Sequence, residues 1–151
     1  SRVDRLRAQL VDDPPVGTGI GRSVYPLPET SYTHGRYDEY VLKLPSPDYH
    51  DSYGYERDGR VQNRAEAALW SDCRSPTAWL VPVVAADQRG HWLIMPRGES
   101  IDSDADWLDA WTARVVEAHG LSSSHGHDID PQNIVRLNGD ARLCDYGLLT
   151  S

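Results

Sequence analysis

Lysine is nearly absent from this chain: among 151 residues there is one lysine, Lys43, against fourteen arginines. Acidic residues outnumber basic ones by 23 to 15, and most of them are aspartates. The formal charge of -8 argues against a general nucleic-acid binder, because no block of Lys or Arg and no basic helix offsets it. Because almost every Lys or Arg position in the chain has arginine, we expect the single lysine, Lys43, to have a specific chemical role.

The lysine-poor, aspartate-rich composition is similar to that of proteins from salt-accumulating halophiles, whose surfaces are acidic. A genome of high GC content produces a similar bias, so two origins of the composition stay open. In either case the acidic surface predicts no nucleic-acid partner.

Cysteine and long apolar runs are also scarce. The two cysteines, Cys73 and Cys144, are too few for a disulfide scaffold, and each is interpreted as a small buried residue. The longest apolar run, AWLVPVVAA, is short and interrupted by Pro82, which predicts no transmembrane helix. No secretory signal opens the sequence, so we expect a cytoplasmic protein without membrane association. The length and the 39% hydrophobic content predict one globular domain over residues 1–151.

Hydrophobic periodicity predicts a chain of both helices and strands. The predicted helices span 2–11, 60–70 and 103–119, and the predicted strands span 23–25, 39–44, 79–86 and 91–95. In the helix 60–70 the expected apolar stripe is Val61, Ala65, Ala68 and Leu69. A polar, tyrosine-rich segment over 45–59 is expected to be a loop, and DQRG at 87–90 a turn between two strands.

The helix 103–119 is expected to begin at Ser103, which would act as its N-cap, and to stop at Gly120. Its apolar stripe of Trp107, Trp111 and Val115 is interpreted as core. This helix would present that stripe to whatever part of the protein, or of a partner, covers it.

Near the end of the sequence, Asn138-Gly139 separates IVRL (134–137) from ARLC (141–144). Asn-Gly between two apolar alternating segments is a strong signal of a two-residue β-hairpin turn. We therefore expect a hairpin at this position.

Three glycines, Gly17, Gly19 and Gly21, lie in the stretch VGTGIGRSVYPLP at 16–28. Glycines at this spacing occur in phosphate-binding loops, at the start of dinucleotide-binding helices and in simple turns. The residues around the glycines decide between these possibilities.

A dinucleotide-binding fingerprint needs a helix directly after the glycines, and Pro26 and Pro28 forbid one. A Walker loop needs Gly-Lys-Ser/Thr, and this chain has Gly21-Arg22-Ser23. By itself, the stretch therefore predicts a glycine turn between two strands, and a plain hairpin turn is the simplest interpretation of it.

Read together, the motifs of residues 16–147 resemble the protein kinase and aminoglycoside phosphotransferase superfamily. They follow the family order of a glycine turn, a VLK strand, a helix with a glutamate, a strand pair, a long helix, D-x-x-x-x-N and D-Y-G. The motifs that carry the resemblance are GTGIGRSV (17–24), VLK (41–43), NRAEAALW with Glu66, HDIDPQN (127–133) and DYG (145–147).

The resemblance implies an α+β fold: a protein kinase-like small lobe, made of an antiparallel sheet plus a helix, and a minimal catalytic stub of the large lobe. An N-terminal helix would occupy 1–15, the small-lobe-like part 16–96, and the long helix with the catalytic loop and DYG hairpin 97–151. Only Leu148–Ser151 follow DYG. We therefore expect a single kinase-like domain truncated after that motif.

The resemblance also implies ATP and Mg²⁺ as cofactors. Backbone N–H groups around Gly17, Gly19 and Gly21 would cover the phosphates, because glycine permits close approach. Lys43 would bind the phosphates as a point charge, and Glu66 would hold that lysine in place.

Catalysis would depend on Asp128, which would accept or orient the proton of an incoming hydroxyl. Asn133 and Asp145 would provide oxygen ligands for Mg²⁺, a hard cation that bridges phosphates. Together with Lys43 and Glu66, these residues form the predicted site.

The motifs depart from the family pattern at several positions. Arg22 stands in the place of the third glycine, where it would either add positive charge at the phosphates or block them. Gly126 and His127 replace the usual His-Arg, which removes a regulatory device rather than the chemistry. Asp130 puts a negative charge near the transferring phosphate, which should hinder transfer.

Two functions stay open. The first is a minimal ATP- and Mg²⁺-dependent phosphotransferase of unknown acceptor. The second is a kinase-derived (pseudokinase) binding or structural module, such as a subunit of a viral particle or other assembly. In that case a protein partner or a second copy of the chain would cover the helix 103–119.

HGHDID (125–130) is also similar to a zinc motif, but its aspartate falls one residue late and no histidine follows.

Overall fold

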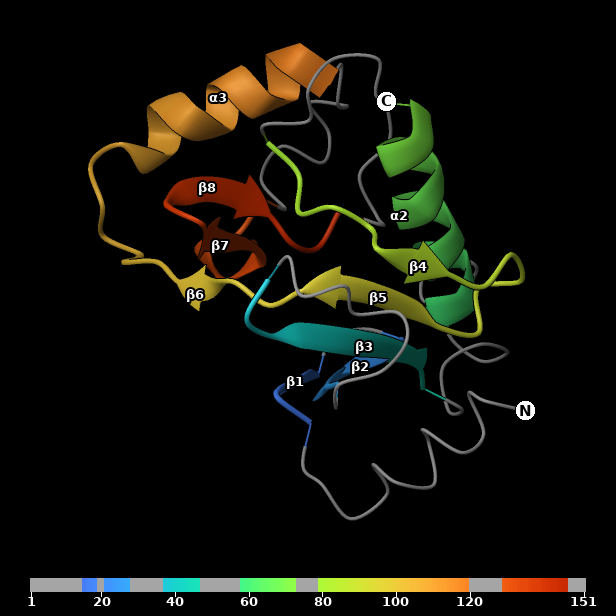
Figure 1. The fold of residues 1–151 in the computed structure, drawn as a ribbon. Coiled ribbons are helices and arrows are strands. Elements are labelled where there is room, and N and C mark those ends of the chain that lie inside the picture. Colours follow the sequence, from blue (N-terminus) through green and yellow to red (C-terminus); the bar gives the residue numbers. More distant parts are fainter. Residues whose placement is uncertain are drawn as a thin grey trace.

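The computed structural model describes residues 15–18, 21–27, 37–46, 58–72, 79–119 and 129–146. This part of the chain is mixed α+β, with two antiparallel sheets and two α-helices (Figure 1). Neither helix has the length and apolar character needed to cross a bilayer. The predicted helix 2–11, Gly19, Gly120, Asp128 and the residues after Tyr146 lie outside the described ranges.

The larger sheet has five strands in the spatial order β1-β2-β3-β5-β4. Its strands are β1 (Gly17–Thr18), β2 (Arg22–Pro26), β3 (Tyr40–Pro45), β4 (Ala85–Ala86) and β5 (Leu93–Pro96). The predicted strands at 23–25, 39–44 and 91–95 are confirmed within a residue or two at their ends. The predicted strand 79–86 is shorter than expected, because only Ala85–Ala86 pairs with β5, whereas Leu80 forms an isolated parallel bridge to Leu143.

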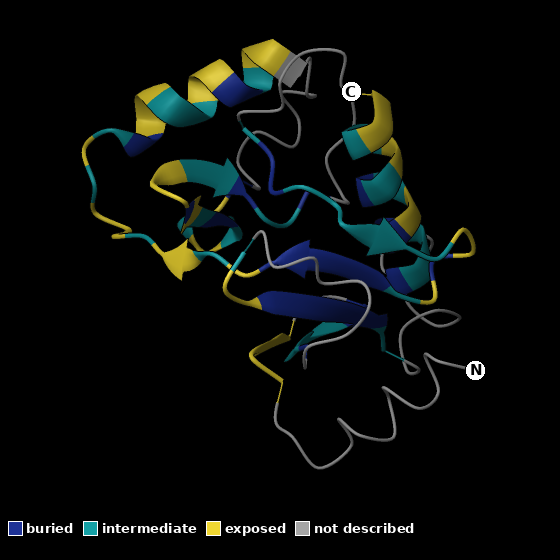
Figure 2. Ribbon diagram, viewed as in Figure 1, coloured by how far each residue is buried: buried dark blue, intermediate teal, exposed yellow. Residues whose placement is uncertain are grey.

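β3 is buried on both of its faces (Figure 2). Val41 belongs to one apolar cluster, together with Leu93 and Met95, and Leu42 belongs to another, together with Ile94. Alternation along the strand places Lys43 on the same face as Val41. A lysine in this position is enclosed by the protein and needs a charged partner.

α2 (Gly59–Asp72) buries a different face from the one predicted. Its buried side chains are Gln62, Asn63 and Glu66, whereas Ala68 is exposed. The expected stripe of Val61, Ala65, Ala68 and Leu69 is wrong at Ala68, whereas Leu69 packs against the apolar core as predicted. The physical reason is that Glu66 and Asn63 meet buried cations on the sheet, so ion pairing as well as apolar packing sets the rotation of this helix. The helix begins after Asp58, whose carboxylate accepts from Arg60 N at 2.9 Å.

α3 (Leu108–His119) begins five residues later than predicted. Asp102 Oδ1 accepts from Asp104 N at 2.9 Å, so the expected N-cap at Ser103 lies inside a side-chain-stabilised turn. Such local bonds compete with the helix for backbone donors. Leu108 and Val115 pack into the core of the chain itself, whereas Trp107 and Trp111 are only partly buried. A partner over this helix stays a prediction.

The second sheet has the order β6-β7-β8, with β6 (Glu99–Ser100), β7 (Ile134–Leu137) and β8 (Asp140–Leu143). The predicted hairpin is confirmed: Asn138 and Gly139 connect β7 to β8 with φ values of 51° and 90°. Positive φ at both central residues is the requirement that Asn-Gly meets with least strain.

Gly59 lies against the glycine turn. A Cβ atom at Gly59 would lie 2.2 Å from the carbonyl oxygen of Gly21 and 2.7 Å from the Cα of Pro45. That carbonyl already accepts from Ser46 N at 2.7 Å, so it has little freedom to move. The closeness of these backbones fixes where the turn meets the start of α2.

Gly59→Ala should lower the free energy of unfolding by about 1–3 kcal/mol, because the added methyl group overpacks a rigid backbone contact. Gly17→Ala is the matched control, since nothing lies within 4 Å of a Cβ there, and it should change stability by less than about 0.5 kcal/mol. Urea unfolding of both variants measures the difference. Equal effects of the two substitutions would contradict the close contact at Gly59.

Candidate functional site

The candidate site is a buried cluster of charged side chains centred on Glu66. The Glu66 side chain is 0% exposed, and those of Arg22 and Lys43 are each 5% exposed. Arg22 Nη1 and Nη2 donate to the two carboxylate oxygens at 2.7 and 2.8 Å, and Lys43 Nζ donates to Oε1 at 2.8 Å. Tyr146 N donates to Oε2 at 2.9 Å. One carboxylate thus receives four hydrogen bonds from three other segments of the chain. We call Arg22, Lys43, Glu66 and Asp145 the ion cluster.

The sheet register brings the two cations of the cluster to one face. Val24 pairs with Lys43 across β2 and β3, and Arg22 lies two residues before Val24 on the same strand. Side chains two residues apart in a strand share a face, so Arg22 and Lys43 both point toward α2. Asn63, one turn before Glu66, accepts from Arg22 Nη1 at 3.0 Å. The polar face of α2 is therefore complementary to this face of the sheet.

Asp145 completes the ion cluster from the segment after β8. Its Oδ1 lies 2.8 Å from Arg22 Nη2, and its side chain is 45% exposed. The carbonyl of the preceding Cys144 accepts from Lys43 Nζ. Thus Asp145 is the one member of the cluster that borders solvent.

Backbone and hydroxyl bonds hold the segment that carries Asp145. Leu143 N donates to Trp79 O at 2.7 Å, and Val81 N donates to Leu143 O at 2.8 Å. The buried hydroxyl of Tyr146 donates to Val81 O at 2.9 Å. These bonds connect the end of the hairpin to the segment 79–81, which precedes β4, and so hold the segment that carries Asp145 in place.

Burial and charge act in opposite directions on Glu66. Burial by itself would raise the pKa of this carboxyl, but the charges of Arg22 and Lys43 and their hydrogen bonds outweigh it and hold the pKa well below its usual range. Burial would lower the pKa of Arg22, but Glu66 and Asp145 raise it above its ordinary value. Burial raises the pKa of the Cys144 thiol to about 11, so this cysteine stays protonated.

The structure brings several of the predicted site residues together. Lys43, Glu66 and Asp145 belong to one cluster, and the predicted Lys43–Glu66 pairing is present. The backbone of Asn133 lies next to the cluster in the fold, because its carbonyl accepts from Cys144 N at 2.8 Å. Of the predicted phosphate-binding glycines, two are described, and their surroundings differ. Gly21 packs against α2, whereas Gly17 lies on an exposed edge strand.

Other predicted residues are placed differently or not described. Gly19 and Asp128 lie outside the described residues. Asp130 caps the 3-10 helix Pro131–Asn133, because its Oδ1 accepts from Gln132 N at 3.0 Å. Its negative charge therefore has a structural role in the turn that precedes Asn133.

Sequence reasoning left the position of Arg22 open and missed Asn63. The expectation was that Arg22 would either add positive charge at the phosphates or block them; in the structure its side chain is buried among Asn63, Glu66 and Asp145. The only available signal was an arginine in place of a glycine. That signal does not indicate which carboxylates the long side chain reaches.

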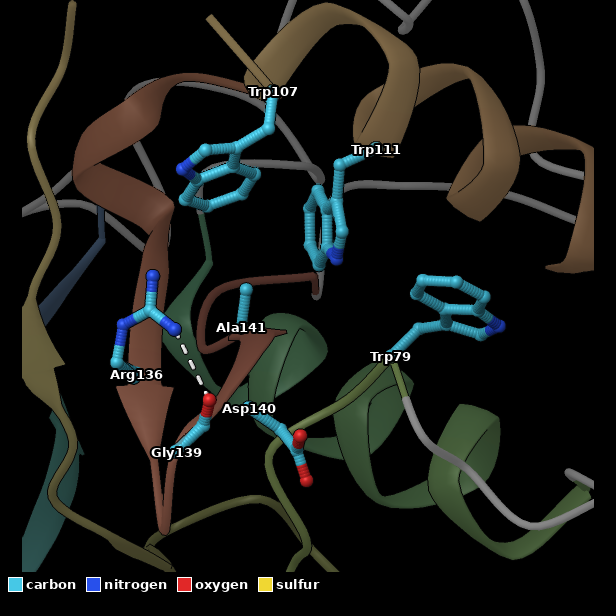
Figure 3. A pocket seen from close by; sticks show the side chains of 7 residues that line it. All are labelled: Trp79, Trp107, Trp111, Arg136, Gly139, Asp140 and Ala141. Carbon is cyan, nitrogen blue, oxygen red and sulfur yellow. Dashed lines mark hydrogen bonds between the residues drawn. The ribbon is translucent and has the colours of Figure 1, made fainter. Parts of the chain in front are cut away.

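A second feature is an aromatic pocket of about 500 Å³ between α3 and the β7–β8 hairpin (Figure 3). The Trp111 ring makes edge-to-face contacts with Trp79 and Trp107, at centroid distances of 6.0 and 6.3 Å. The Arg136 guanidinium lies 5.7 Å from the Trp107 ring centroid. Trp107 and Trp111, interpreted from the sequence as core, pack against the core cluster and also line this pocket. The lining residues are Trp79, Trp107, Trp111, Arg136, Gly139, Asp140 and Ala141.

Metal-binding groups are not evident in the described part of the chain. There, no cluster of three or more His, Cys, Asp and Glu side chains is placed to share a metal ion. The zinc-like motif at 125–130 lies mainly outside the described residues, so its histidines are not placed.

Comparisons with known proteins identify no relative of this chain. No family model matches the chain, and no curated protein matches it. The geometry of the ion cluster is therefore the basis for the functional interpretation.

Glu66→Gln should lower the free energy of unfolding at neutral pH by about 3–5 kcal/mol, because it leaves two buried cations short of a counter-charge. The wild-type carboxylate contributes fully above its unfolded-state pKa of about 4.3, and this contribution is lost as the pH falls toward its lower folded pKa. The stability of Glu66→Gln should therefore fall less steeply than that of the wild type below about pH 4.3.

Urea unfolding across the acidic range measures both effects. Glu99→Gln, which removes an exposed carboxylate from β6, is the control and should follow the wild type. A Glu66→Gln variant as stable as Glu99→Gln at neutral pH would show that Glu66 does not organise the cluster.

Proposed function

We propose that this chain is a kinase-like binding module that holds the phosphates of a nucleotide such as ATP at Lys43. The observation that carries the proposal is the buried ion pair of Lys43 Nζ and Glu66 Oε1, 2.8 Å apart. It is the pairing of strand lysine and helix glutamate that the resemblance implies. A compact ammonium held by a carboxylate keeps one orientation, and such a charge is suited to phosphate oxygens.

The arrangement around the pair supports the same proposal. Arg22, directly after the glycine turn, lies 2.8 Å from Asp145, so the turn and the DYG segment meet at the ion cluster that contains Lys43. The order of elements from β1 through α2 to β5 follows the small-lobe order expected from the motifs. A glycine turn near Lys43 and Asp145 is where a cover for phosphates would be needed.

Mg²⁺ is the cation that the resemblance implies at Asn133 and Asp145. When bound, it would neutralise and bridge phosphate oxygens. The residues present do not fit this ion in the observed arrangement, because Asp145 Oδ1 is already paired with the Arg22 guanidinium. This favours a module that binds over an enzyme that transfers a phosphoryl group.

A phosphotransferase is the second candidate. Asp145 is 45% exposed, so part of its carboxylate faces solvent even while Arg22 holds Oδ1. Transfer would require Arg22 to leave Asp145 and Asp128 to stand near the acceptor hydroxyl. The binding function needs neither condition.

We expect wild-type protein to bind ATP at high salt and Lys43→Ala to bind it about tenfold or more weakly, because a charge-assisted contact to phosphate is lost. Isothermal titration calorimetry, with Mg²⁺ and with EDTA, measures both affinities. The fold should survive the substitution, since Glu66 keeps its bonds from Arg22 and Tyr146.

Arg64→Ala is the matched control, because it removes one positive charge from the exposed side of α2. It should leave ATP affinity unchanged, and thermal unfolding should show that both variants are folded. Absence of ATP binding by the wild type in both conditions would overturn the proposed function.

A further inference from the structure

The guanidinium of Arg22 makes four hydrogen bonds, one of which goes to Asp145. Nη1 donates to Asn63 and Glu66, and Nη2 donates to Glu66 and Asp145, all at 2.7–3.0 Å. The side chain is 5% exposed. The four hydrogens of the two terminal nitrogens thus all have partners, and the guanidinium plane is fixed.

Glu66 is the anchor that keeps the guanidinium in this orientation. Its two oxygens receive Nη1 and Nη2 in a bidentate arrangement, which resists rotation of the planar fork. With Glu66 bound on one side, Nη2 is directed at Asp145 Oδ1. Arg22 can leave Asp145 only by tilting a group that Glu66 holds at two points.

The charges of the ion cluster balance without any added ion. Arg22 and Lys43 provide two positive charges, and Glu66 and Asp145 provide two negative ones. A Mg²⁺ ion binds carboxylate oxygen at about 2.1 Å, so on Asp145 it would lie close to the Arg22 guanidinium and be repelled by it. Arg22 therefore occupies Oδ1 of Asp145, and its positive charge opposes a divalent cation at either oxygen of this carboxylate.

We propose that the Arg22 guanidinium replaces a divalent cation at Asp145, so that this site accepts nucleotide phosphates without a metal ion. The inference about nucleotide rests on the proposed function; the exclusion of a metal from Asp145 does not. Arginine suits the role because it stays charged and presents a fixed fork of donors to a carboxylate. Lys43 then provides the charge at the phosphates, and Arg22 neutralises the carboxylate that would otherwise repel them.

The first test uses Mn²⁺ alone, with free Mn²⁺ measured by electron paramagnetic resonance at high salt. In the wild-type background, Asp145→Asn should not change Mn²⁺ binding. Arg22→Gly should gain a site that Arg22→Gly/Asp145→Asn lacks. Arg22→Gln repeats the test with a polar, uncharged side chain, and Arg64→Gln controls for the loss of one positive charge.

Thermal unfolding shows which variants are folded. If Arg22→Gly is not folded, the test uses Arg22→Gln in its place. A wild-type Mn²⁺ site that disappears in Asp145→Asn would overturn the inference. So would the failure of the folded Arg22 variants to gain an Asp145-dependent site.

The second test compares ATP affinity in Mg²⁺ and in EDTA. Wild-type affinity should differ by less than about twofold, whereas Arg22→Gly should bind about tenfold more weakly in EDTA and recover with Mg²⁺. A wild-type affinity that rises about tenfold with Mg²⁺ would overturn the inference and leave the proposed function standing. Absence of ATP binding would overturn the proposed function and the metal-free nucleotide site, and the Mn²⁺ test would still decide whether Arg22 excludes a cation.

Discussion

The buried carboxylate of Glu66 is the interaction on which the rest of this structure depends. An ion removed from water loses several kcal/mol of solvation unless charged and hydrogen-bonding partners replace the water. Here those partners come from β2, β3 and the segment after β8, in the form of Arg22, Lys43 and Tyr146 N. Satisfying one carboxylate therefore requires the larger sheet, the helix α2 and the end of the hairpin to meet at a single point.

This requirement explains features that hydrophobicity alone leaves unexplained. α2 turns Asn63 and Glu66 inward and leaves Ala68 exposed. Arg22 and Lys43 occupy buried positions in β2 and β3, although both carry a charge. Leu93, which pairs with Lys43 across the sheet, belongs to the apolar core, and burial of the ion cluster beside that core strengthens its electrostatics. Packing and charge thus support the same arrangement.

The same cluster connects the fold to the proposed function. Lys43 is oriented by Glu66 and lies near the glycine turn, an arrangement suited to anionic phosphate. Asp145, the group that a metal would need, is neutralised by the neighbouring Arg22. Arg22, which stands in the place of a glycine, therefore favours binding of phosphates over metal-dependent transfer at this site. Binding of phosphates needs the positive charge at Lys43, whereas phosphoryl transfer also needs a free ligand for the cation.

The sequence by itself determined the local elements and the identity of the main pair. Alternation predicted β3, Asn-Gly predicted the β7–β8 turn, and the resemblance carried by the motifs implied the pair of Lys43 and Glu66. Tertiary structure decided the buried face of α2, the late start of α3 and the position of Arg22. Short-range patterns report backbone preference and periodicity, but a guanidinium that bonds residues 41, 44 and 123 positions away responds to charges that only the folded chain brings together.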